Sequence, residues 1–257
     1  MWFIKEKIGL VLGGGGARGF FHMGVIKGLQ EMNIKIDEVS GTSIGAIIGT
    51  IYAANPDIHF EKIINDLNFL RLIKAVVLGK NNDSGEKIER FLRNYIKVSY
   101  FDELRIPMSF NATDINNRKE VVFTKGRIFP AIVASMSIPG IFYPIKYHDK
   151  FLVDGGVINN IPISLNRAKK IIVSDITGPV KKIDENSSIT DIFYSSFAVM
   201  QQDNSLGRDD ILKRKKIVYL SLDDNKTLLL DFRKKNYQKL IDLGYQSIMK
   251  QKNRLVK

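Results

Sequence analysis

Short apolar runs alternate along the chain with segments in which apolar residues recur every three or four positions. A short apolar run bounded by turn residues is typical of a buried strand, and the longer spacing is typical of an amphipathic helix. Strands are predicted on this basis at residues 7–12, 38–40, 108–113, 120–124, 151–153, 170–174 and 217–222. Helices are predicted at residues 21–33, 44–54, 189–200 and 228–243, and another helix is predicted to begin at the capping sequence Asp83-Ser84-Gly85-Glu86.

This alternation of strands and helices is typical of an α/β protein with a mainly parallel sheet. We therefore predict a three-layer α/β/α sandwich around a mainly parallel central sheet. The chain has no internal repeat and no low-complexity linker, so residues 1–257 are assigned to a single domain. Residues 181–257 are predicted to form a helical, basic C-terminal part of that domain.

The first predicted strand ends in a glycine-rich loop. Residues Gly14-Gly15-Gly16-Ala17-Arg18-Gly19 have the pattern G-x-G-x-x-G between a predicted strand and a predicted helix. In dinucleotide-binding folds such a loop holds a pyrophosphate, and Asp37 follows at close to the spacing of about 20 residues expected for the acidic residue that binds the ribose. Amides at a helix N-terminus stabilise a reaction oxyanion equally well, so the loop predicts an anion site without naming the anion.

A second glycine motif, Gly41-Thr42-Ser43-Ile44-Gly45, lies at the next junction of strand and helix. It has the form G-x-S-x-G of a nucleophile elbow, a tight turn in which the two glycines leave room for the backbone and the serine hydroxyl projects outward. The dipole of the following helix favours negative charge at Ser43. This context favours a nucleophilic serine over an ordinary Ser-Gly turn.

A nucleophilic serine needs a base within hydrogen-bond reach. Among the three histidines, only His148 suits the base of a Ser-His-Asp triad, with Asp102 or Asp114 to orient it. Each of the three histidines, including His148, is nevertheless expected to be a surface or packing residue.

An aspartate at a strand end is the other option for the base. In the sequence Phe151-Leu152-Val153-Asp154-Gly155-Gly156, Asp154 ends a predicted strand and two glycines allow a sharp turn after it. Such a carboxylate must be desolvated and bonded to the serine to act as a base near neutral pH. Asp114 and Asp175 also end predicted strands and compete with Asp154 on position alone.

Taken together, the glycine loop, the elbow and the Asp154-Gly155-Gly156 turn resemble, in that order, the motifs of the patatin-like phospholipase family. Weaker family-like strings occur at residues 111–114, 135–140 and 157–162, and the resemblance covers about residues 7–180. It implies a patatin-like fold and a serine acyl hydrolase that cleaves lipid esters with a Ser-Asp dyad and no histidine, and that needs no metal or other cofactor.

The resemblance also implies roles for individual residues. By position, Ser43 is the nucleophile and Asp154 the general base. The amides of Gly14, Gly15 and Gly16 supply the oxyanion hole, and Arg18 holds that loop or meets a phosphate.

Composition bears on partners and compartment. The chain has no cysteine, which excludes disulfides, thiolate metal sites and a cysteine nucleophile. Its N-terminus carries charges where an export signal needs an apolar run, and its longest nearly uncharged apolar stretch, Ile44–Ala54, is much shorter than the roughly 20 residues that a membrane span needs. A cytoplasmic protein is therefore expected, with peripheral membrane contact and homo-oligomer formation left open.

The formal net charge of +12 is concentrated in residues 206–257, which hold 14 basic and 6 acidic residues. A solvated charged face is the first interpretation, contact with an anionic membrane surface the second and nucleic acid the third, because no nucleic-acid-binding motif accompanies the charge. Residues 66–80 contain a broad apolar face, interpreted as a core-packing helix or as a lid that docks on lipid.

Three alternatives to a Ser-Asp lipid hydrolase remain from the sequence. One is an oxidoreductase that binds a dinucleotide through the first glycine loop and Asp37. Another is a protein of the same fold that binds lipid or membranes without catalysis. The third is an esterase that uses Ser43 with His148.

Overall fold

The structure is a computed structural model that describes residues 6–60, 63, 84–178, 182–203, 213, 215–224 and 234–256. The segment 66–80, the residue Asp83 and residues 228–233 lie outside this described part, so the predictions made for them are not addressed.

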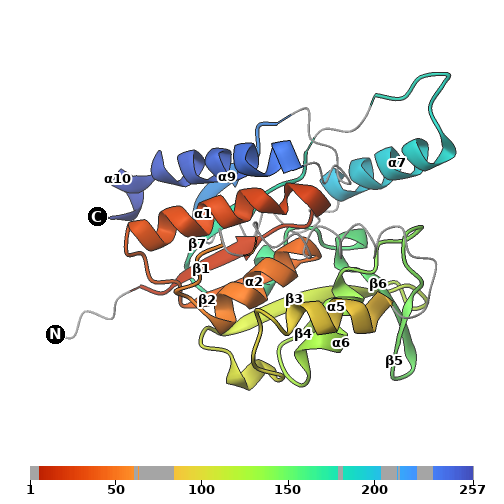
Figure 1. Ribbon diagram of the computed structural model, residues 1–257, viewed down its shortest axis with the longest axis horizontal. Coiled ribbons are helices and arrows are strands. Elements are labelled where there is room, and N and C mark those ends of the chain that lie inside the picture. The colour runs from red at the N-terminus through yellow and green to blue at the C-terminus, as the bar shows by residue number, and fades with distance from the viewer. Residues whose placement is uncertain are drawn as a thin grey trace.

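A central mixed sheet organises the fold (Figure 1). Its strands lie in the order β5-β6-β3-β2-β1-β7-β8, and β4 pairs with β3 beside this path. Strands β3, β2, β1, β7 and β8 run parallel, whereas β4, β6 and β5 are antiparallel to their neighbours. The bounds are β1 Ile8–Leu12, β2 Glu38–Thr42, β3 Met108–Asp114, β4 Lys119–Phe123, β5 Ile145–Tyr147, β6 Lys150–Asp154, β7 Lys170–Asp175 and β8 Lys216–Ser221. The predicted mainly parallel sheet is confirmed.

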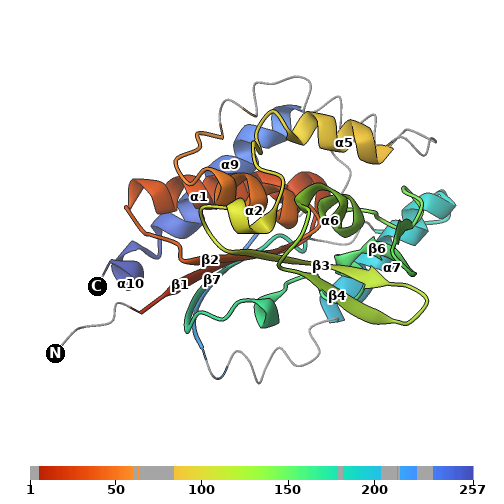
Figure 2. The same ribbon diagram turned by 90° about the horizontal axis from the view of Figure 1, so that it is seen from below.

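Helices cover the sheet mainly from one side. The α-helices are α1 Phe20–Glu31, α2 Ile44–Ala54, α5 Ser84–Leu92, α6 Ile128–Ser135, α7 Ile189–Asp203, α9 Lys234–Met249 and α10 Lys252–Leu255. Figure 2 shows α1, α2, α5, α6 and α9 together on one side of the sheet. The largest apolar core lies between these helices and the strands. On the other face, Ile163 and Ala168, from the segment after β6, pack on apolar side chains of β1 and β7 in a smaller cluster.

The C-terminal helix α9 packs directly on α1 (Figure 1). A Cβ atom at Gly24 would collide with the carbonyl oxygen of Ile241, and one at Gly244 would collide with that of Phe21. Gly24 and Gly28 of α1 both face α9, where Gly28 meets Ile248. The close approach of the two helices therefore depends on glycines from both of them.

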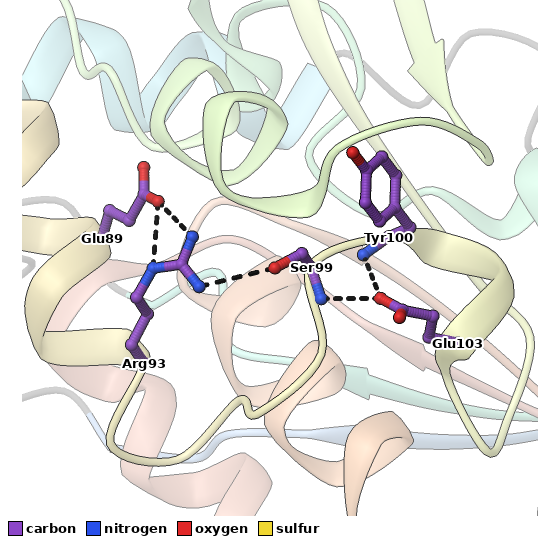
Figure 3. Close-up of polar contacts among 5 residues, drawn as sticks. All are labelled: Glu89, Arg93, Ser99, Tyr100 and Glu103. Atoms are coloured by element: carbon purple, nitrogen blue, oxygen red, sulfur yellow. Dashed lines mark hydrogen bonds and ion pairs between the residues drawn. The ribbon is translucent and has the colours of Figure 1, made fainter.

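Polar side chains fasten the connection that leads from α5 into β3 (Figure 3). Arg93 donates to Glu89 and Ser99, and the Glu103 carboxylate accepts from the amides of Ser99 and Tyr100 at 2.8 Å each. Glu103 thereby caps the short 3-10 helix Phe101–Glu103 that precedes β3. The chain consequently enters β3, a strand that borders the site, in a defined register.

Candidate active site

Ser43 occupies the turn between β2 and α2 in a conformation rare for a residue with a side chain. Its φ is 55° and its ψ is −121°, and its side chain is almost fully buried. Its amide donates to the Ser135 hydroxyl at 3.1 Å, which holds the strained turn in place. A Cβ at Gly41 would lie 2.5 Å from the carbonyl oxygen of Gly45, and a Cβ at Gly45 would collide with that of Leu12. The turn therefore requires glycine on both sides of the serine.

The register of the sheet brings Asp154 to this turn. Thr42, the last residue of β2, pairs with Asn111 of β3, and Asp154, the last residue of β6, pairs with the next residue, Ala112. Because β4 occupies the other edge of β3, β2 and β6 share one edge and end at the same point. The Ser43 turn and the Asp154-Gly155-Gly156 turn, which are distant in sequence, thus lie together where β2 and β6 end.

The Asp154 carboxyl is buried, and only one of its two oxygens accepts a hydrogen bond of ordinary geometry. Its Oδ1 accepts from the amide of Gly156 at 2.7 Å. Its Oδ2 accepts no hydrogen bond of ordinary geometry from any described residue. Burial raises the pKa of Asp154 to about 7, and interactions with the Ser43 hydroxyl and the Gly156 amide lower it in part. A carboxylate with this pKa and an unused oxygen is suited to accept a proton near neutral pH.

The loop begins with four consecutive glycines, Gly13 to Gly16, whose amides are not equivalent. Those of Gly13 and Gly14 are used inside the fold, donating to the carbonyl oxygens of Ser174 and Asn160 at 3.0 Å each. Those of Gly15 and Gly16 have no acceptor among the described residues. Gly14 still adjoins Ser43, because a Cβ at Gly14 would lie 3.4 Å from the Cβ of Ser43. In this conformation only Gly15 and Gly16 of the three predicted donors have amides available to an anion.

Arg18 holds the glycine loop against the segment that follows β7. Its guanidinium is buried, donates to the carbonyl oxygen of Ile176 at 3.3 Å, and packs on the backbone of Gly178. Burial lowers the pKa of Arg18 to about 10, against the opposing effect of Asp224 and Asp175. Of the two roles predicted for Arg18, this geometry favours holding the loop over meeting a phosphate.

His22 supports the same loop, a role that the sequence did not assign beyond packing. Its Nε2 lies 2.9 Å from the carbonyl oxygen of Gly13, and its Nδ1 lies 2.7 Å from the Ser174 hydroxyl. A carbonyl can only accept, so Nε2 carries the proton and the serine hydroxyl donates to Nδ1. Burial lowers the pKa of His22 to about 4, so the ring is neutral at physiological pH and locks the loop without adding charge.

The competing acids and bases lie elsewhere. Asp114 accepts from the amide and side chain of Asn117, which lowers the pKa of its carboxyl, and Asp175 accepts from the Tyr219 hydroxyl and the amide of Thr177. His148 is exposed on the hairpin turn between β5 and β6, at the end of β6 opposite Asp154. The strand separates the two ends by roughly 13 Å, at about 3.3 Å per residue, and so places His148 away from the serine and acid.

Asp37 does not face the glycine loop. It precedes β2 and accepts from the amide of Ile8, at the amino end of two parallel strands whose carboxyl ends carry the loop and Ser43. A dinucleotide held by the loop needs its acidic residue at the carboxyl end. The prediction of a dinucleotide site built from the loop and Asp37 is therefore wrong.

Comparison with known proteins identifies the family of the chain. Residues 10–166, more than half of the chain, match the family model described as patatin-like phospholipase. The chain belongs to the patatin-like phospholipase family. The matched range contains the glycine loop, the elbow and the Asp-Gly-Gly turn.

Relatives and solved structures extend the comparison. An uncharacterized NTE family protein of Mycobacterium bovis is 34% identical over 163 residues, which are 62% of this chain and 45% of the relative. The lysophospholipase NTE1 of Yarrowia lipolytica is 33% identical over 172 residues, which are 64% of this chain and 12% of the relative. The chain thus spans less than half the length of these curated relatives. VipD of Legionella pneumophila has the same fold, with a TM-score of 0.55 at 15% identity over 98% of this chain and 67% of that one.

Among the described residues, neither a membrane-spanning helix nor a metal-binding cluster is present. No helix among them combines the length and apolar character needed to cross a bilayer. No group of three or more acidic or histidine side chains within the same residues is arranged to hold a metal ion.

Proposed function

We propose that this chain is a serine acyl hydrolase of lipid esters that uses Ser43 and Asp154 as a dyad. The observation that carries the proposal is the meeting of a strained, glycine-flanked serine with a buried carboxyl that has one unused oxygen and a pKa near 7. Family membership and the names of the lysophospholipase relatives support lipid esters as the substrate class.

In the proposed reaction, Ser43 Oγ attacks the ester carbonyl while Asp154 Oδ2 takes the hydroxyl proton. The amides of Gly15 and Gly16 and the N-terminus of α2 stabilise the oxyanion that forms on the carbonyl oxygen. Collapse breaks the ester bond, and Asp154 returns the proton to the departing alcohol. Water then attacks the acyl-serine while Asp154 again accepts a proton. Asp154 passes this proton to Ser43 Oγ as the acyl-serine bond breaks, which releases the fatty acid and restores the Ser43 hydroxyl.

The direct experiment is to incubate the wild-type chain with lysophosphatidylcholine and with a soluble short-chain ester, and to quantify released fatty acid. Release from both esters is expected, because acyl transfer to Ser43 depends on the ester carbonyl that they share. Vesicle binding with no release from either ester would instead support a non-catalytic lipid-binding protein and contradict the proposal.

The face of α7 beside the site supports contact with a lipid surface. Gly156 packs against Gln201 of α7, and Gly140 packs on the ring of Phe193. The outward side of this helix carries exposed apolar side chains at Ile189, Ile192, Phe193, Val199 and Met200. The sequence has no charged residue between Asp191 and Asp203. Such an uncharged apolar stripe suits insertion among phospholipid acyl chains, and it does not require the anionic headgroups that the basic excess suggested.

Replacing Ile189 or Met200 by glutamate should weaken binding to phosphatidylcholine vesicles by about tenfold or more, since inserting each apolar side chain contributes about 1.5–3 kcal/mol. Cosedimentation with vesicles measures this, and hydrolysis of the soluble ester should be unchanged. The matched control is Val256→Glu, which alters a similarly exposed residue beside α10, at the far end of the molecule from α7 (Figure 1). Equal losses in the control, or an α7 substitution that splits a dimer and leaves vesicle binding intact, would contradict the assignment.

A further inference from the structure

Asn160 is a buried residue that lies between the glycine loop and the Asp154-Gly155-Gly156 turn. Its side chain is 2% exposed. Its Nδ2 donates to the carbonyl oxygen of Gly14 at 3.2 Å and to the Thr177 hydroxyl at 3.1 Å. Its own carbonyl oxygen accepts from the amide of Gly14 at 3.0 Å. Asn160 therefore holds Gly14 through both the main chain and the side chain.

The oxygen of the Asn160 side-chain amide, Oδ1, faces the Asp154-Gly155-Gly156 turn. The hydrogen bond to the Gly14 carbonyl fixes which atom is nitrogen, because the opposite orientation would set two oxygens against each other. Oδ1 then lies against the Cα atoms of Gly14 and Gly156, since a Cβ at Gly14 would collide with it and one at Gly156 would come within 2.8 Å. It accepts no conventional hydrogen bond from a described residue. Together with Asp154 Oδ2, it is one of two such buried side-chain atoms in the described part of the chain.

A buried polar atom without a partner is costly, so its retention beside the site calls for an explanation. A larger side chain would not fit between Gly14 and Gly156, and a smaller one would leave the two backbones without a contact between them. The amide plane fills this gap and touches the two backbones at the same time.

We propose that Asn160 is a positioning residue for the acyl hydrolase reaction, setting the distance between the oxyanion loop and the Asp154 turn. The assignment rests on the proposed function, because it concerns the geometry of that dyad. Asn160 does not touch the reacting atoms. It acts on Gly14, which adjoins Ser43, and on Gly156, whose amide binds Asp154 Oδ1.

The chain offers a matched control for a purely structural role. Asn166 is equally buried and also braces backbone, with its Nδ2 near the carbonyl oxygens of Leu10 and Glu38. Glu38 begins β2, so Asn166 lies toward the amino end of the strands, opposite Ser43. Loss of either asparagine should lower the unfolding temperature, but only Asn160 should govern the chemistry.

The experiment measures kcat and KM for the soluble ester with Asn160→Ala, Asn160→Asp and Asn166→Ala, each at a temperature where circular dichroism shows it folded. Asn160→Ala is expected to lower kcat about 10- to 100-fold with little change in KM, because a misplacement near 1 Å costs on this order. Asn166→Ala should keep kcat within about threefold, well below that expected misplacement cost.

Asn160→Asp supplies a readout that a structural role would not change. A carboxylate between Gly14 and Gly156 would repel the negative charge on Asp154 and move the acidic limb of the pH–rate profile to higher pH, whereas Asn160→Ala should leave that limb in place. A kcat for Asn160→Ala near the wild-type value, or an equal loss in Asn166→Ala, would overturn the inference. Retained activity in Ser43→Ala would instead overturn the proposed function itself, so the two failures are distinguishable.

Discussion

Replacing Ser43 by alanine is expected to lower kcat for ester hydrolysis by at least about 10⁴-fold, toward the uncatalysed rate. Without Oγ no acyl-enzyme can form, and in a studied serine protease loss of the nucleophile alone costs on the order of 10⁶ in kcat. Alanine can replace serine in this strained turn without loss of packing. The variant should therefore fold and retain vesicle binding. Release of fatty acid from a soluble ester measures the effect.

The control for this variant is a neighbouring serine. Ser40 lies on β2, is fully buried, and donates to the carbonyl oxygen of Pro162. Ser40→Ala should remove one hydrogen bond, worth about 1 kcal/mol of stability, and leave kcat close to that of the wild type. Undiminished hydrolysis by Ser43→Ala would show that the acyl group is transferred at another residue.

Replacing Asp154 by asparagine is the second large expected effect. General-base catalysis contributes about 10²–10⁴-fold, so kcat should fall by that order while the fold is preserved. Asparagine keeps an oxygen for the amide of Gly156 but cannot take a proton from Ser43. Asp114→Asn is the matched control, since Asp114 also ends a strand but bonds to Asn117, and it should leave kcat nearly unchanged.

The pH dependence follows from the same carboxyl. Only ionised Asp154 can act as a base, so kcat/KM of the wild type should rise with pH and level off above about pH 7, near the pKa of Asp154. In Asp154→Asn this limb should disappear. A wild-type profile that is flat between pH 5 and 8, or one that Asp114→Asn shifts, would contradict the assignment of the base.

Stability should change in the opposite direction to activity. The pKa of Asp154 in the folded state, about 7, is above its ordinary value of 3.8, so between these pH values the folded state binds more protons than the unfolded state. The free energy of unfolding of the protein therefore falls as the pH rises from about 4 to about 7. Because one pKa unit corresponds to about 1.4 kcal/mol, Asp154→Asn should gain up to about 4 kcal/mol at pH 8 and little at pH 4. Thermal unfolding at the two pH values measures this.

Much of the fold was predictable because strands such as β1 and β7 are short apolar runs. β1, β3 and β7 agree with their predicted ranges to within a residue or two, and the parallel core of the sheet follows from them. Helix α6 was not predicted because Pro130 interrupts its sequence, although proline is tolerated in the first turn, where it lies. Strand β5 was not predicted either, because it is only three residues long and depends on its pairing with β6.

The candidate site was predictable where a single local motif determines the chemistry, as at Ser43. The meeting of Ser43 with Asp154 depends on strand register, which no local pattern encodes. The same holds for the commitment of the Gly14 amide to Asn160 and for the support of the loop by His22. His22 and Asn160 reach their partners from 9 and 146 residues away, respectively, so only the folded chain reveals what they hold.

The pairing of Ser43 with Asp154 is tested most directly by labelling with a fluorophosphonate, followed by mass spectrometry of the modified peptide. The wild type should carry the label on Ser43, His148→Ala should label at the wild-type rate, and Asp154→Asn should label at least about tenfold more slowly, since it lacks the base. Label on a different serine, or Ser43 labelling that is independent of Asp154 and lost in His148→Ala, would contradict the dyad.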